Sequence, residues 1–332
     1  MSRDDGARPI AVRTVAASPP ALGGRSALLG AGAAILRFGR RKPLGAFGAV
    51  IVIAMLLMAA FAERIAPHGY DDMIRGARMK PPSFSHWLGT DNLSRDIWSR
   101  VVYGARVSLT VGFGTILLGT LLATAIGVAS GYFGGVFDMA VVCVVDAWIS
   151  FPFFVIAISV LAVLGPGLLN VILSIAVVVA ATNSRVIRGA TISAMQNAYV
   201  EAARAMGAGH ARIILRHVLP NVAPTIVILA TIGLGGVILA ESALSFLGFG
   251  VPPPYPSWGA MLSGSGRTYM YQAPWMAIWP GVAVSLAVFG FNMLGDALRD
   301  VLDPRLRGSG EDGPTAASAP GDAAPAGGSA VR

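Results

Sequence analysis

The sequence has 332 residues, of which 55% are hydrophobic and only 13% are charged, and its mean hydropathy is +0.66. A soluble domain carries about a quarter charged residues, so this chain cannot cover its surface with polar groups, and an ordinary soluble protein is excluded. The net charge of +8 does not indicate nucleic-acid binding, because no basic run is interleaved with stacking aromatics. Excess Lys and Arg is instead typical of the cytoplasmic segments of membrane proteins. The single cysteine, Cys143, lies in an apolar run, which excludes a disulfide framework and a thiolate metal site.

Residues 1–42 are rich in Ala, Gly, Pro, Ser and Arg, and we predict that they form a cytoplasmic tail. Arg40, Arg41 and Lys42 directly precede an apolar run that is long enough to cross a hydrocarbon core of about 30 Å. These positive charges favour a cytosolic start for that span. Further apolar runs predict an all-α transmembrane domain over residues 43–307, with both termini in the cytosol and six spans at about 44–65, 107–130, 139–164, 168–188, 222–246 and 274–295.

The connections between the spans differ in length and composition. Residues 63–106 are polar and are predicted to lie outside, as is the proline-rich loop at 248–273. Residues 131–135, Gly-Tyr-Phe-Gly-Gly, predict a tight turn on the inner side. Residues 308–332 combine Gly, Ala, Pro and Ser with few aromatics and predict a disordered cytoplasmic tail.

The longest inner connection, residues 189–221, has the pattern of two short helices joined by a break. Residues 190–206 are rich in helix formers, and Gly207 suits the left-handed position that ends a helix. A second short helix is predicted over 211–218, ending before Pro220. The alanines make the first helix slim enough to enter a groove on another protein, and chain reversal alone needs only about two to eight residues. We therefore predict that this loop is a docking element.

These residues resemble the signature loop of binding-protein-dependent ABC importer permeases: Glu201-Ala202-Ala203, Gly207, and Leu219-Pro220. The general motif has Ile where this chain has His217, but residues 216–221, Arg-His-Val-Leu-Pro-Asn, are similar to the peptide-importer branch. The resemblance covers about residues 37–307 and is specific to the C-type permease of dipeptide and oligopeptide importers, a group that includes nickel importers. The outer motif departs from the family at Ser94, where Gly is usual. Further blocks agree with the family, namely residues 87–91, 95–96, 150–152, 241–250, 256–259 and 292–304.

The resemblance implies a type I ABC importer permease with six transmembrane helices in the cytoplasmic membrane. It implies a homologous second permease subunit, two ATP-binding subunits and an extracytoplasmic substrate-binding protein as partners. The chain itself is expected to hold no catalytic residue, metal or cofactor, because it has no Gly-x-x-x-x-Gly-Lys-Ser/Thr phosphate loop; ATP and Mg²⁺ belong to the partner subunits. The residues implied in coupling to the ATPase are Glu201, Ala202, Ala203, Gly207, Leu219 and Pro220.

Two other functions stay open at this point. The same architecture could import nickel or another small solute, because the receptor selects the cargo. An intramembrane Ser–His hydrolase is disfavoured, because none of the histidines falls within the predicted spans; they are His68, His86, His210 and His217.

Polar residues in or near the spans are candidates for the pathway or gate, since intramembrane polar groups are costly and often functional. Glu241 either caps the outer loop or lines the gate. Asn183 and Asn292 either line the pathway or form hydrogen bonds between helices. Asp146 is expected to pair with Arg185 or Arg188.

Overall fold

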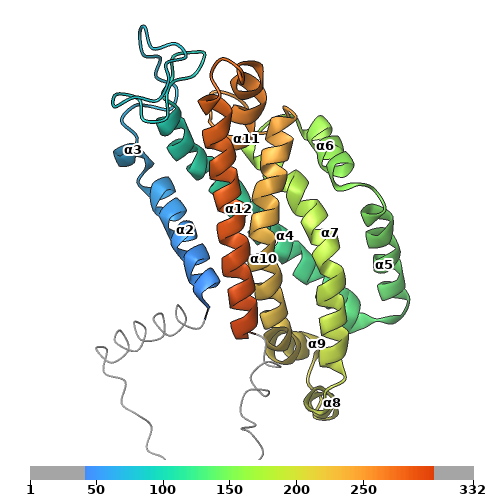
Figure 1. Cartoon of the computed structure of the whole chain (residues 1–332). Helices are drawn as coiled ribbons and strands as arrows, with labels where there is room; N and C mark the ends of the chain where they lie inside the picture. The colour runs from blue at the N-terminus through green and yellow to red at the C-terminus, as the bar shows by residue number, and fades with distance from the viewer. Residues whose placement is uncertain (1–41, 303–332) are drawn as a thin grey trace, which may run out of the picture. The chain divides into compact units, whose positions relative to one another are not determined.

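The computed structural model describes residues 42–302, so the predicted tails and residues 303–307 lie outside the described part. The chain divides into two units, residues 1–43 and residues 44–332. The described part of the second unit is largely helical (Figure 1), and its only β contact is an isolated antiparallel bridge between Thr90 and Asp96. The helices are α2 (Pro43–Ala60), α3 (Ala62–Ile65), α4 (Ile97–Phe133), α5 (Gly135–Ile149), α6 (Phe153–Leu164), α7 (Leu168–Met195), α8 (Ala198–Ala205), α9 (His210–Ile213), α10 (Leu219–Phe246), α11 (Trp258–Met261) and α12 (Trp275–Leu302), with single π-helical turns η1 (Ile214–Val218) and η2 (Leu262–Gly266).

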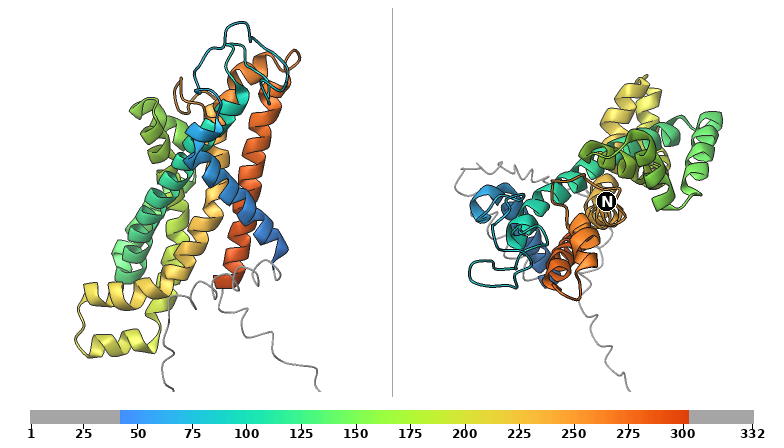
Figure 2. Two further views of the ribbon diagram at one scale, coloured as in Figure 1. Left: turned by 90° about the vertical axis from the view of Figure 1, so that its left-hand side faces the viewer. Right: turned by 90° about the horizontal axis from the view of Figure 1, so that it is seen from above.

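Helices α4 and α7 pack closely and run parallel to each other (Figure 2). Glycines on α4 allow the close approach, as small residues commonly do in membrane helices. A Cβ at Gly119 would lie 3.1 Å from the carbonyl oxygen of Ala176, and a Cβ at Gly127 would lie 2.6 Å from that of Ser184. Because the partner number on α7 rises with the residue number on α4, the two helices point in the same direction.

Helices α5 and α6 carry the chain back from the end of α4 to the start of α7. They are bent by 93° at a short break, so the third predicted span is two helices rather than one. Pro152 lies in this break and directly precedes α6, where its missing N–H costs no helical hydrogen bond. Five described helices are long and apolar enough to span a membrane by themselves, and there are six such segments if the bent pair is counted as one span. Because α4 and α7 run in the same direction, α5 and α6 must carry the chain back across the bundle between them. This arrangement confirms the predicted all-α, six-span architecture.

Helix α10 packs antiparallel to α4. Ile238 of α10 faces Gly112 of α4, while Gly233 faces Ile116 one turn further along α4. The chain therefore crosses back along α10 in the direction opposite to α4 and α7.

Helix α12 packs antiparallel on α10, and α2 packs antiparallel on α12. Asn292 of α12 lies over Gly235 of α10, and a Cβ at Gly48 of α2 would lie 2.8 Å from the carbonyl oxygen of Gly290. With these directions, the long segments 66–96 and 247–274 lie at the same end of the bundle (Figure 1).

Helix α4 begins at Ile97, earlier than the second predicted span, and includes residues expected in the polar outer loop. Asp96 caps its first turn by accepting a hydrogen bond from the Ser99 backbone N–H at 2.8 Å. Arg100 is buried in the helix but donates to the carbonyl oxygen of Tyr70 at 2.9 Å. Composition alone assigns these polar residues to a loop, whereas tertiary partners satisfy them within a helix.

Other helix ends also extend beyond the predicted spans. Helix α7 continues to Met195, α10 begins at Leu219 and α12 continues to Leu302. The outer segment 248–273, predicted only as a loop, contains α11 and η2. Hydropathy marks the hydrocarbon-crossing part of each helix, and these helices are longer than that part.

Two clusters of buried apolar side chains stabilise the bundle. The larger contains Trp258, which is fully buried and donates its indole N–H to the carbonyl oxygen of Val101 at 3.0 Å. Gly104 makes room for this ring, since a Cβ there would lie 2.8 Å from the Trp258 Cδ1. The smaller cluster lies at the opposite end, where Val200 and Ile213 join the connection between α7 and α10 to the bundle.

Candidate functional site

The connection between α7 and α10, the α8–α9 element (residues 196–218), lies at the end of the bundle opposite the long segments 66–96 and 247–274 (Figure 1). Figure 2 shows α8 beside the helical segment that leads into α10. The single helix predicted over 190–206 is instead divided, because α7 ends at Met195 and α8 begins at Ala198. The side-chain amide of Asn197 donates to the carbonyl oxygens of Ser193 at 3.4 Å and Ala194 at 3.0 Å, which satisfies the end of α7.

Gly207 ends α8 in the left-handed conformation, with φ +79°, which confirms its predicted backbone role. The N–H of Ala208 donates to the carbonyl oxygen of Ala203 at 3.0 Å, and the N–H of Gly207 donates to that of Arg204 at 2.9 Å. This pair of bonds is the Schellman motif, which satisfies the last carbonyls of a helix and favours glycine at the left-handed position. The turn after α8 is therefore defined by its own hydrogen bonds.

The predicted stop at Pro220 is wrong. The second helix of the element passes through η1 directly into α10, so that helical structure runs without a break from His210 to Phe246. The N–H of Leu219 donates to the carbonyl oxygen of Ile214, five residues back, which is the spacing of a π-helical turn. Pro220 is the second residue of α10, directly after this turn, and it has no N–H to donate to the helical segment before it.

The predicted coupling residues fall on different faces of the element. Glu201, Ala202 and Gly207 are exposed, as is Met206 at 82% of its full surface. Ala203 is buried against the bundle, so the expectation that the alanines together form a slim free face holds only in part. Leu219 is half-buried and Pro220 is exposed at the start of α10.

Comparisons with known proteins assign this architecture. A family model described as "binding-protein-dependent transport system inner membrane component" matches residues 116–308, more than half of the chain. The chain belongs to this family. A second model, the N-terminal transmembrane domain of oligopeptide transport permease C, matches residues 33–82.

Among the relatives of this permease are two bacterial transport proteins. It is 40% identical over 268 residues to the dipeptide transport system permease DppC of Alkalihalophilus pseudofirmus, which covers 81% of this chain and 88% of the relative. It is 40% identical over 275 residues to the glutathione transport system permease GsiD of Escherichia coli, covering 81% and 89%. A chain of the MetNI methionine ABC transporter, in an inward-facing conformation, has the same fold with a TM-score of 0.51 and 22% identity, covering 62% of this permease and 98% of that chain.

Glu241 of the permease is fully buried between helices rather than open to a pathway. Its carboxylate accepts hydrogen bonds from the hydroxyls of Ser245 at 2.7 Å, Ser108 at 3.3 Å and Ser242 at 3.4 Å. Ser108 belongs to α4, so this carboxylate joins α4 to α10 near the C-terminal end of α10. In this conformation Glu241 is a link between helices, and it faces no described cavity.

Asn183 and Asn292 were expected either to line the pathway or to form hydrogen bonds between helices, and they form no interhelical hydrogen bond within the described residues. Asn292 instead packs over the Gly235 backbone of α10, and Asn183 lies half-buried on α7. The expected ion pair of Asp146 is confirmed, because Arg185 lies 2.7 Å from its carboxylate.

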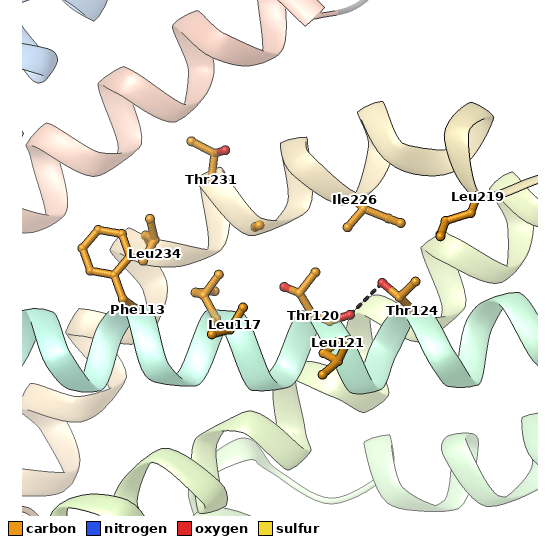
Figure 3. Close-up of a pocket in the computed structure, with 11 residues that line it drawn as sticks. Phe113, Leu117, Thr120, Leu121, Thr124, Leu219, Ile226, Thr231 and Leu234 are labelled. Carbon is orange, nitrogen blue, oxygen red and sulfur yellow. Dashed lines mark hydrogen bonds between the residues drawn. The ribbon is translucent and has the colours of Figure 1, made fainter. Parts of the chain in front are cut away.

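A groove of about 520 Å³ between α4 and α10 is a feature that the sequence reasoning missed (Figure 3). Its lining is almost wholly apolar, and the hydroxyls of Thr124 and Thr231 donate to carbonyl oxygens of their own helices at 2.7 Å each. Of the three lining threonines, only Thr120 has a hydroxyl without a hydrogen-bond partner, so the lining offers a peptide backbone few of the hydrogen bonds that it requires. The sequence signal was only an apolar stripe shared by two spans, with Phe113, Leu117, Leu121, Ile226 and Leu234 among the lining residues.

A cavity of about 230 Å³ with both polar and apolar lining residues lies between the segment before α4 and the proline-rich segment after α10. Arg95 and Arg100 both line it. Asp91 accepts from Arg95 at 2.8 Å and lies 3.9 Å from Arg100, which fixes both guanidinium groups. Ser94, the departure from the family motif, adopts φ +64°, so the turn keeps a conformation that favours glycine.

Proposed function

We propose that this permease is the membrane-spanning subunit of an ATP-driven importer that carries dipeptides and oligopeptides across the cytoplasmic membrane. The observation that most strongly supports this proposal is the 40% identity, over 81% of the chain, to two relatives whose names describe transport of dipeptides and of glutathione. Glutathione is a tripeptide, so both names describe short peptides. The identity extends over 88% and 89% of these relatives, which supports a subunit of the same kind.

The α8–α9 element is the part of the chain suited to receive work from an ATPase. It presents Glu201 and Ala202 on an exposed face, and its turn at Gly207 is defined by two backbone hydrogen bonds. A short helix with an exposed face can dock in a groove of a partner protein. In this proposal ATP and Mg²⁺ are bound by two partner subunits, and this chain holds no cofactor.

The proposed orientation places the α8–α9 element and both termini in the cytosol. Within residues 196–218 there are three arginines, Arg204, Arg212 and Arg216, and one acidic residue, Glu201. An excess of positive charge is typical of cytoplasmic loops. The opposite end, with the cavity lined by Arg95 and Arg100 (the outer cavity), then faces the extracytoplasmic binding protein, and a homologous second permease completes the pathway.

The test is uptake by the complete complex, reconstituted in liposomes with its ATPase subunits, second permease and binding protein. We expect ATP-dependent accumulation of radiolabelled dipeptides and tripeptides, and competition between them. An excess of Ni²⁺ or of free amino acids is the control competitor and should leave peptide uptake unchanged. Accumulation of Ni²⁺ without accumulation of peptide would contradict the proposal.

A further inference from the structure

The α4–α5 corner (residues 130–138) is the tight turn of the sequence, and it lies against the α8–α9 element. Helix α4 ends at Phe133, and Gly134 and Gly135 follow with φ +63° and +58°. Two consecutive left-handed residues turn the chain directly into α5 without a loop. Tyr132, just before the turn, is buried with 6% of its surface exposed.

Tyr132 contacts both arms of the α8–α9 element. Its hydroxyl lies 2.8 Å from Nδ1 of His210, the first residue of α9, and the two rings meet edge to face at 5.7 Å between centroids. On α8, the guanidinium carbon of Arg204 lies 5.9 Å from the centroid of the Tyr132 ring, within the range of a cation–π contact. Arg204 therefore faces α4 and forms no ion pair with Glu201 in the described part of the chain.

The rest of the corner is held by α7. Asp138 at the start of α5 accepts a bidentate pair of hydrogen bonds from Arg188 of α7 and a further bond from Ser130 of α4. Gly131 packs so closely on α7 that a Cβ there would lie 2.9 Å from the carbonyl oxygen of Arg188. The corner is thus fixed to α7 by polar bonds and to the α8–α9 element through Tyr132.

Apolar packing alone does not fix the direction of the α8–α9 element. Val200 and Ile213 bury their side chains in the smaller cluster, but apolar burial is non-directional. A hydrogen bond has a preferred distance and angle, so the bond between Tyr132 and His210 is a directional contact between the element and α4, in addition to the cation–π contact of Arg204. Helix α4 has 37 residues, or about 55 Å at 1.5 Å per residue, and its other end carries Arg100 at the outer cavity.

We propose that Tyr132 is a positioning residue that joins the α8–α9 element to α4, so that displacement of the element by the ATPase also moves α4. This inference rests on the proposed function. In this arrangement α4 transmits the displacement as a continuous helix from the cytosolic corner to the outer cavity. Loss of the tyrosine hydroxyl leaves the element in place, through its apolar cluster, but loosens its link to α4.

The test compares Tyr132→Phe with wild type in the complete reconstituted complex, by measuring ATP hydrolysed and peptide imported in the same vesicles. We expect ATP hydrolysis to stay near the wild-type rate, while peptide imported per ATP falls about two- to tenfold, the range that corresponds to one net hydrogen bond. The matched control is Tyr103→Phe, also on α4. The guanidinium carbon of Arg106 lies 5.9 Å from the centroid of the Tyr103 ring, but the Tyr103 hydroxyl has no hydrogen-bond partner among the described residues, so the ratio should not change.

A second variant, His210→Phe, removes the partner nitrogen but keeps an aromatic ring. It should lower the ratio as Tyr132→Phe does, and the double variant should be no worse than either single variant, because both remove one bond. A wild-type ratio in Tyr132→Phe, or additive losses in the double variant, would overturn the inference. Equal loss of ATP hydrolysis and uptake would overturn it too, because Tyr132 would then only hold the complex together. Failure of the wild-type complex to import peptide would instead count against the proposed function.

Discussion

At the residue scale, Gly207 and Gly209 lie two positions apart in the same exposed turn, yet only one of them requires glycine. Gly207 has φ +79°, whereas Gly209 has φ −69° and ψ 158°, which any residue adopts easily. An added Cβ would meet no atom within 4 Å at either position. The two glycines therefore differ in backbone conformation and not in the space around them.

This difference predicts opposite outcomes for the same substitution. Gly207→Val should disrupt the turn after α8, because a non-glycine residue in the left-handed region costs about 1–2 kcal/mol and a β-branched residue costs more. We expect ATP hydrolysis to be uncoupled from peptide uptake in reconstituted vesicles, while Gly209→Val retains the wild-type ratio. Normal uptake by Gly207→Val would contradict the role assigned to this turn.

The residue roles that could be predicted are those decided by local sequence. Gly207 was identifiable because helix formers precede it, and its backbone conformation depends on its immediate neighbours. The links that Glu241 and Tyr132 make between elements could not be predicted, because each has a partner far away in the sequence: Ser108 lies 133 positions from Glu241, and His210 lies 78 positions from Tyr132. A side chain inside an apolar run gives no local indication of such partners.

At the element scale, the packing of α4 on α7 depends on glycines that face the partner backbone. Gly127 faces α7, and a Cβ there would lie 2.6 Å from the Ser184 carbonyl oxygen and 3.0 Å from the Arg188 nitrogen. Gly236 is also within a spanning helix, α10, but it is exposed, and an added Cβ would meet nothing within 4 Å. These two positions separate the effect of helix packing from the effect of helix propensity.

Gly127→Ala should destabilise the permease, whereas Gly236→Ala should not. Alanine gains about 1 kcal/mol of helix propensity over glycine at either site, but overpacking against a backbone costs about 1–3 kcal/mol. We expect Gly127→Ala to lower the midpoint of thermal unfolding in detergent, and Gly236→Ala to leave it unchanged or raise it slightly. A midpoint for Gly127→Ala at or above that of Gly236→Ala would show that α4 and α7 do not pack this closely.

The existence of the spanning helices was predictable from hydropathy, but their ends and breaks were not. Helix α4 begins among polar residues because Asp96 caps it and Tyr70 accepts a bond from Arg100. Proline has opposite outcomes at two positions: it precedes α6 at the 93° break, and it lies within the first turn of α10 without ending the helical run. The π-helical turn that accommodates Pro220 depends on hydrogen bonds that no residue pattern specifies.

At the scale of the whole molecule, the parallel register of α4 and α7 decides the topology. Two parallel neighbours cannot be joined by a turn at one end, so α5 and α6 must cross the membrane in spite of their 93° bend. If α5 and α6 instead returned to the side on which α5 begins, the start of α7 would lie beside the α4–α5 corner. In the structure it is the end of α7, at Arg188 and Thr191, that packs on Gly131 of this corner. The short turn between α6 and α7, which contains Pro166, therefore belongs on the same side as the segment before α4.

Single-cysteine labelling tests this topology, and because Cys143 is the lone cysteine, the single substitution Cys143→Ala yields a cysteine-free background. In that background we choose three exposed positions: Phe84→Cys in the segment before α4, Met206→Cys after α8 and Pro166→Cys between α6 and α7. The relative exposure of the side chains at Phe84 and Met206 is 104% and 82%. In right-side-out membrane vesicles, a membrane-impermeant maleimide should label Phe84→Cys and Pro166→Cys directly. Met206→Cys should be labelled only after the vesicles are opened.

The position of Pro166→Cys decides between a crossing and a re-entrant pair, because hydropathy and helix length permit both. Labelling of Pro166→Cys together with Met206→Cys would mean that α5 and α6 return to the cytosolic side, and the parallel arrangement of α4 and α7 would then be wrong. Labelling of Met206→Cys in closed vesicles would instead reverse the orientation, since the α8–α9 element would lie outside, where no ATPase could reach it. Labelling of Pro166→Cys from the cytosolic side would contradict the fold, whereas labelling of Met206→Cys in closed vesicles would contradict the proposed contact with the ATPase. The three cysteines therefore test the fold and the orientation of the permease separately.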